Sequence, residues 1–164
     1  MKKTIIFTAL VLSFNMFACT NPIKSNPEKQ LNNSNASKTT EAMKSLISIF
    51  EIPATEISRA IAFYQAILDI KIENMDFPEI RMGLFPYEGQ IVTGVIIKGE
   101  GYQPSANGVT IYLNGGDNLQ VILDKVEKNG GKILVSKTLH ADESGYFALF
   151  LDSEGNKIGL HSPN

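Results

Sequence analysis

Near residue 53 the spacing of hydrophobic residues changes from alternation to every three or four positions, which predicts a strand followed by a helix. Residues 46–52 alternate bulky apolar side chains with Ser48 and Glu51, and Pro53 then ends the run, as expected of a strand with one buried face. Thr55 is the predicted helix N-cap. The apolar residues that follow recur every three or four positions, which is the spacing of one helix face: Ile57, Ala60, Ile61, Tyr64, Ile67 and Leu68.

The same order of elements recurs roughly 60 residues later, which is too long a period for a solenoid repeat. Residues 109–113 (VTIYL) are rich in β-branched and aromatic side chains, and Asp117 is the predicted cap of a second helix. Gly130 and Gly131 end that helix, because glycine tolerates the left-handed conformation of a C-terminal cap. The apolar face of the helix comprises Leu119, Ile122, Leu123 and Val126.

Each helix is followed by three further strand patterns, so the chain is predicted to contain two tandem βαβββ units. The turn Glu-Gly-Gln at 88–90 in the first unit has a counterpart in Glu-Gly-Asn at 154–156. We therefore predict an α+β fold in which a four-stranded sheet and one helix form each unit, at 45–98 and 108–162, and the two mixed sheets form a cup. The predicted strands lie at 71–75, 80–85, 91–97, 132–135, 146–151 and 157–161, with a polar loop at 138–144.

The first 43 residues have a different character from the predicted domain, which spans 44–164. Residues 1–19 begin with a short basic segment, continue as an apolar run too short to span a bilayer, and end at Cys19, as a secretory signal does. Residues 20–43 are polar and predict a flexible tether. The position of Cys19 resembles the end of a bacterial lipoprotein signal, with Met16 where Leu is usual. The resemblance implies lipidation of Cys19 and a membrane-anchored protein on the periplasmic or cell-surface side; the alternative is an ordinary cleaved signal.

The formal net charge is −2, and acidic and basic residues are interspersed. No basic stripe is present, so the sequence does not favour a nucleic-acid partner.

The segments FEIPATEISRAIAFYQAIL (50–68) and GYFALFLDSEGNKIGL (145–160) resemble the vicinal oxygen chelate superfamily, which includes glyoxalases, bleomycin resistance proteins and extradiol dioxygenases. The resemblance covers residues 46–161. In catalytic members, His and Glu ligands to a divalent metal come from the first and last strands of each unit. These positions fall on Ile49, on Gly94 to within one residue, on Thr110 and on Gly159 here, and none of these four is a His or a carboxylate. The resemblance therefore implies a relative without metal or other cofactor.

Side chains two positions apart on a strand point the same way. Each of the four positions that correspond to family metal ligands should therefore share its face with the residue two positions later: Glu51, Ile96, Tyr112 and His161. We expect Glu51, Tyr112 and His161, with Ile49 and Thr110, to line a ligand cavity that glycines at 94 and 159 widen. Glu51 and His161 are alternatively a general base and acid, or a rim charge and a solvated terminal residue. Tyr112 is alternatively core filling. His140, Asp142 and Glu143 could form a cluster, although exposed loop charge is the simpler interpretation.

The leading hypothesis is an exported protein that binds an unidentified small molecule without a metal ion. An enzyme of the same superfamily, such as a lyase, isomerase or dioxygenase acting on a small oxygenated substrate, is the alternative. A subunit without a ligand is a third class. The resemblance also implies a possible homodimer, because units in this family pair within one chain or between two.

Overall fold

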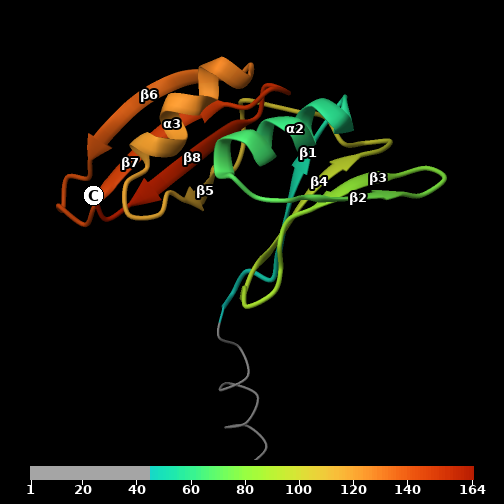
Figure 1. Ribbon diagram of the computed structural model, residues 1–164, viewed down its shortest axis with the longest axis horizontal. Coiled ribbons are helices and arrows are strands. Elements are labelled where there is room, and N and C mark those ends of the chain that lie inside the picture. The colour runs from blue at the N-terminus through green and yellow to red at the C-terminus, as the bar shows by residue number, and fades with distance from the viewer. Residues whose placement is uncertain (1–44) are drawn as a thin grey trace, which may run out of the picture.

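The computed structural model describes residues 45–164, which form two sheets with one principal helix on each (Figure 1). A short 3₁₀ helix, η1, follows the second helix. No helix among these residues is long and apolar enough to cross a membrane. The elements of the first unit are β1 (Ile49–Pro53), α2 (Ile57–Leu68), β2 (Glu73–Asp76), β3 (Arg81–Leu84) and β4 (Thr93–Lys98). Those of the second are β5 (Ile111–Asn114), α3 (Gln120–Val126), η1 (Glu127–Asn129), β6 (Lys132–Leu139), β7 (Tyr146–Leu151) and β8 (Lys157–Ser162).

The two sheets share one topology. Their strand orders are β1-β4-β3-β2 and β5-β8-β7-β6, and the first strand of each unit pairs in parallel with the last. The other pairs are antiparallel. A parallel pair needs a long crossover connection, and the helix and two intervening strands supply it. The predicted α+β fold of two tandem βαβββ units is thus confirmed.

The predicted loop at 138–144 is shorter than expected. Strand β6 continues to Leu139 because Thr138 and Leu139 pair with Phe147 and Tyr146 after register shifts further back along the strand. A bulge of this kind lets a strand continue past a break in its regular pairing. The polar loop therefore begins only at His140.

One continuous core lies between the sheets and their helices. Phe63 and Tyr64 on α2 and Phe150 on β7 are each at most 2% exposed and are among its largest side chains. The rings of Phe63 and Phe150 lie 6.1 Å apart, so the core crosses from one unit to the other. The predicted apolar face of the helix omits Phe63, although this residue too lies three positions after Ala60.

Both helices begin without the caps that the sequence predicts. The N-cap residue of α2 is Glu56, and its side chain makes no capping hydrogen bond. The hydroxyl of Thr55 does not cap the helix either, but donates a hydrogen bond to Glu154 at 2.7 Å. At α3, Asp117 is likewise not the cap. The amides of Leu119 and Gln120 donate to Ser162 Oγ and Asn118 Oδ1. The prediction was wrong at both helices because other residues bond the first amides: Glu154 at α2, and Ser162 together with the neighbouring Asn118 at α3.

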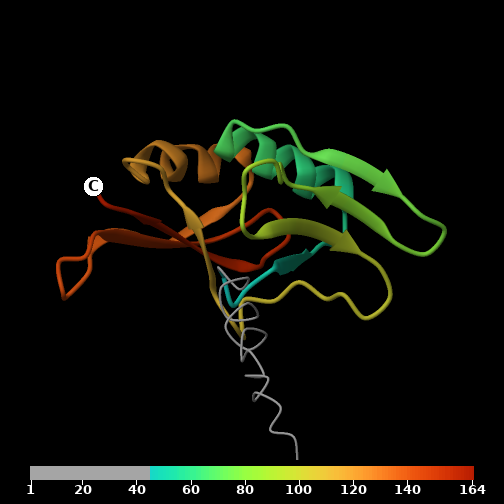
Figure 2. The same ribbon diagram turned by 90° about the horizontal axis from the view of Figure 1, so that it is seen from below.

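The two helices lie on the same side of the molecule, and the opposite faces of the sheets carry no helix (Figure 2). We call these the helix-free faces. The linker between the units, residues 99–110, passes across this side beneath β1 (Figure 2).

Candidate functional site

On the first sheet, β1 presents two of the predicted site residues to the helix-free face. Ile49 is 60% exposed and Glu51 is also exposed, whereas the next residue, Ile52, is 2% exposed in the core. In the parallel register Glu51 lies beside Val95, and Phe50 lies beside Gly94. Side chains of paired residues share a face, so Val95 faces the same way as Glu51.

Gly94 and Ile96 therefore point toward the helix, contrary to prediction. Ile96 is completely buried, and a Cβ on Gly94 would lie 2.5 Å from the ring of Phe50. In this strand the position that corresponds to a family metal ligand is Val95, one residue after Gly94. Gly94 does not widen a cavity on the helix-free face, because an aromatic ring fills the space on its own side.

On the second sheet, β5 and β8 bring Tyr112 and Gly159 together. The two residues are partners in the parallel register, and a Cβ on Gly159 would lie 2.6 Å from Tyr112 Cε1. The ring of Tyr112 thus lies directly over the glycine while remaining 47% exposed. Thr110 precedes β5 and is half-buried. Tyr112 is a surface aromatic on this face, and it occupies the space where a longer side chain at 159 would project.

These residues do not fit a divalent metal ion. The positions on the helix-free face that correspond to family ligands carry Ile49, Val95, Thr110 and Gly159, and the ring of Tyr112 covers the last of them. Within residues 45–164 no group of three or more His, Cys, Asp or Glu side chains is arranged to hold a metal. Aliphatic side chains and glycine offer no donor atom.

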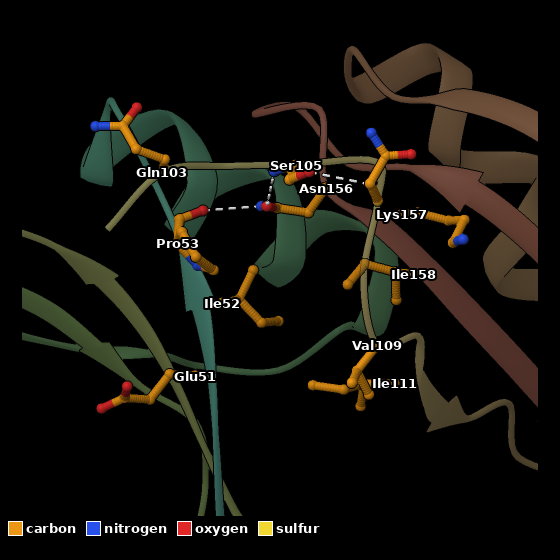
Figure 3. Close-up of a pocket in the computed structure, with 11 residues that line it drawn as sticks. Glu51, Ile52, Pro53, Gln103, Ser105, Val109, Ile111, Asn156, Lys157 and Ile158 are labelled. Carbon is orange, nitrogen blue, oxygen red and sulfur yellow. Dashed lines mark hydrogen bonds between the residues drawn. The ribbon is translucent and has the colours of Figure 1, made fainter. Parts of the chain in front are cut away.

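A small pocket lies at the seam between the two units, with a volume of about 180 Å³ (Figure 3). Ile52 from β1 and Ile111 and Ile158 from the second sheet project into the seam, and linker residues 103–109 close it (Figure 3). Of the five predicted ligand-binding residues only Glu51 lines this pocket, and its carboxylate points away from Ile111 (Figure 3).

Glu51 has a neighbour that the sequence did not suggest. Its negative charge, together with partial burial, raises the pKa of the Tyr102 phenol in the linker. The linker therefore approaches β1 at both Tyr102 and the pocket. A charged side chain in the first unit and a tyrosine in the connecting segment form the polar rim of the seam.

His161 lies elsewhere. It is exposed near the end of β8, and its ring centroid is 5.4 Å from that of His140, which is 4.8 Å from that of Phe147. The structure does not bring Glu51 and His161 into one pocket, because Glu51 lies beside the beginning of β8 and His161 is near its end.

The turn at residues 152–156 forms a buried polar network that joins the two units. The hydroxyl of Tyr64 donates to Asp152 Oδ2 at 2.7 Å, and Asn156 Nδ2 donates to the carbonyl of Pro53 at 2.8 Å. Burial, and then the nearby charge of Asp152, raise the pKa of Tyr64 well above its ordinary value. The repeated Glu-Gly-Asn pattern marks this turn in the sequence, but its partners lie about a hundred residues earlier.

A larger groove of about 590 Å³ also lies between the units, away from the predicted site. Its apolar lining comes from the end of α2, the turn after β3, the end of β5 and the beginning of α3, including Leu68, Phe85, Leu113 and Val121. The volume falls within the range of roughly 300–1,000 Å³ typical of small-molecule pockets. No single strand or helix pattern could have indicated it, because four segments form it together.

The Glyoxalase/Bleomycin resistance protein/Dioxygenase superfamily model matches residues 46–160. A glyoxylase-like domain-containing protein of Didymella fabae is 36% identical over 115 residues, which are 67% of this chain and 88% of that protein.

Solved structures show the same fold at low sequence identity. A mutant of glyoxalase I from Zea mays has a TM-score of 0.55 at 17% identity. The match covers 71% of this chain and only 46% of the maize chain. A glyoxalase/bleomycin resistance protein of Albidiferax ferrireducens has a TM-score of 0.55 at 20% identity, covering 72% and 98% of the two chains. TnmS3, an antibiotic binding protein of Streptomyces, has a TM-score of 0.54 at 19% identity, covering 73% and 97%.

Proposed function

Because this chain belongs to the Glyoxalase/Bleomycin resistance protein/Dioxygenase superfamily, we propose that it binds a small organic molecule without a metal ion. The observation that carries the proposal is the contact between Tyr112 and Gly159. A metal ligand on the last strand of the second unit would occupy the space of the tyrosine ring. An aromatic surface replaces a coordination site at this point, and an aromatic ring with a hydroxyl suits recognition of an amphipathic ligand.

A binding role has a counterpart among structures with this fold. TnmS3 is an antibiotic binding protein and shares the fold at 19% identity. At that identity the likeness extends to the fold alone, so TnmS3 illustrates the proposal and does not identify the ligand.

We place the ligand on the helix-free face, against Tyr112 and the exposed residues of β1. Ile49 on β1 and Val109 in the linker are 60% and 93% exposed and provide apolar surface. Burial of exposed apolar area favours binding. We propose that a second copy of the chain packs across this side and encloses the ligand, because the seam pocket of about 180 Å³ is too small to enclose one alone. Sedimentation of the full chain as a strict monomer with bound ligand would contradict this.

The test is binding of metal-free bleomycin and a panel of apolar aromatic compounds to the full chain in the presence of EDTA. We expect saturable binding that the chelator does not weaken. Tyr112→Ala should weaken it about tenfold, since loss of an aromatic anchor costs more than 1 kcal/mol. Tyr87→Ala removes a similarly exposed tyrosine, 55% exposed, outside the helix-free seam and should have no effect.

Two results would count against this placement. Binding that EDTA abolishes would indicate a metal-dependent site. Binding that survives Tyr112→Ala but is lost in Val121→Asp would assign the ligand to the groove of about 590 Å³.

We also propose that the protein is exported and held at the membrane through a lipid on Cys19, with residues 20–43 as the tether. These residues lie outside the described part of the chain. Partition of the full chain into a detergent phase, and its loss in Cys19→Ser, would support the anchor. Equal partition of both forms would exclude it.

A further inference from the structure

We propose that His140 and His161 form a binding site for a borderline divalent cation such as Zn²⁺, Ni²⁺ or Cu²⁺ at the outer end of the second sheet. The site is separate from the family metal position at the seam. It lies close to the C-terminus, at the end of the molecule away from β1–β4 (Figure 1). This inference does not depend on the proposed binding of a small organic molecule without a metal ion.

The spacing of the two rings fits one shared ion. Their centroids are 5.4 Å apart and their planes are inclined by 47°. A metal bound to one nitrogen of each ring at about 2.0–2.1 Å, with a tetrahedral angle between them, places the ring centres about 5 Å apart. Chelation thus requires only small side-chain rotations.

Both residues are held by well-defined backbone. The backbone amide of His140 donates a hydrogen bond to the carbonyl of Gly145 at 2.9 Å, and its backbone carbonyl accepts one from the amide of Glu143 at 3.0 Å. His140 therefore closes the base of the loop. His161 is paired with Phe147 in the β7–β8 ladder. Phe147 also packs against the ring of His140, which limits the orientations of that ring. Two elements of fixed geometry therefore present the imidazoles to each other.

The ring nitrogens are available. Among the hydrogen bonds of residues 45–164, none uses a side-chain nitrogen of His140 or His161. His161 Nε2 lies 3.2 Å from the point where a Cβ on Gly145 would be, so a larger residue at 145 would crowd it. A glycine at this position leaves the imidazole room to turn toward an ion.

The protein supplies two ligands to this site, and solvent would fill the remaining positions. No third His, Cys, Asp or Glu side chain among residues 45–164 is arranged to join them. Imidazole nitrogens favour Zn²⁺, Ni²⁺ or Cu²⁺ over Ca²⁺ or Mg²⁺, which prefer sites made of oxygen ligands alone.

The chain makes a clean experiment possible, because it contains only these two histidines. The full chain, purified without a histidine tag, is titrated calorimetrically with ZnCl₂ alone and, separately, with NiCl₂. We expect one ion per chain and a rise in unfolding temperature on binding. His140→Ala and His161→Asn should each weaken binding by at least about tenfold, as expected for loss of a direct ligand.

Asp124→Asn serves as the matched control, since this exposed carboxylate lies on α3 away from the loop and its removal should leave the affinity unchanged. Circular dichroism of each variant checks that the fold is retained. Zinc affinity that is the same in both histidine variants and in the parent, or no saturable binding at all, would overturn the proposal. Neither result would affect the EDTA-insensitive ligand binding proposed above.

Discussion

Glu154 shows how one side chain can replace a local helix cap. Its carboxylate is fully buried and accepts hydrogen bonds from the amides of Thr55 and Glu56 at 2.9 and 3.0 Å. It also accepts from Arg59 Nε at 2.7 Å. Burial by itself would raise the pKa of Glu154, but the bonds from Arg59, Thr55 and the two amides outweigh it and the pKa is lowered. The negative charge satisfies first-turn amides at the positive end of the helix dipole.

Replacing Glu154 by Gln should therefore destabilise the protein by about 2–3 kcal/mol at neutral pH, the typical contribution of hydrogen bonds to a charged group. Since the folded pKa lies below the ordinary value of 4.5, this stabilisation is complete above that value and is lost as the pH falls through the folded pKa. Urea unfolding from pH 7 to pH 3 should show the difference between parent and Glu154→Gln shrinking on acidification.

Glu100→Gln, an exposed carboxylate in the linker, is the control and should follow the parent throughout. A difference between the parent and Glu154→Gln that is constant with pH would mean that the charge of Glu154 is not what stabilises the helix.

At the scale of elements, a close approach between backbones sets the end of the helical segment formed by α3 and η1. Gly130 takes a left-handed φ of 91° after the short 3₁₀ turn, as predicted from the glycine pair. The next residue, Gly131, has a different role. A Cβ there would lie 2.6 Å from the carbonyl oxygen of Leu151 and 2.7 Å from Val126. The chain can pass from helix to β6 over the end of β7 only without a side chain at this position.

Gly131→Ala should accordingly lower the free energy of unfolding by about 1–3 kcal/mol through overpacking. The matched control is Gly99→Ala, where the nearest atom to a new Cβ is 3.3 Å away and the φ angle is not left-handed. Thermal unfolding of the two variants measures the difference. Equal unfolding temperatures would show that the backbones separate without cost.

At the scale of the whole molecule, Asn156 connects both units and the linker. Its side chain donates to the carbonyl of Pro53 and to Asp152 Oδ2 and accepts from the amide of Ser105 at 3.0 Å. Asn156 is 5% exposed, so these bonds are shielded from water. The amide side chain has both donor and acceptor atoms, and a single residue can therefore serve three segments.

Asn156→Ala should expose the linker as well as destabilise the fold by roughly 1–3 kcal/mol, because buried partners lose their hydrogen bonds. Hydrogen–deuterium exchange should be faster at the Ser105 amide and in the segment around it. Asn107→Ala, an exposed residue of the same linker, should leave the exchange of Ser105 unchanged. Unaltered Ser105 exchange in Asn156→Ala would show that the linker is held by other contacts.

The local sequence pattern indicated more of the fold than of the site. The period of apolar residues located both helices, and alternation located β7 at 146–151 with the observed bounds. Strand parity also placed Ile49 and Glu51 on one face, and Tyr112 with Gly159. These features depend on neighbours a few positions apart, which a sequence displays directly.

The amino-acid sequence alone thus determined the order of elements, the duplication and the lack of metal-ligating side chains at the usual family positions. Only the tertiary structure decided that Glu154 caps a helix 99 residues away, that Tyr112 covers Gly159, and that His161 lies beside His140. Periodicity follows from the geometry of a single helix or strand. Contacts between elements depend instead on register, twist and packing, which no single segment of the chain specifies.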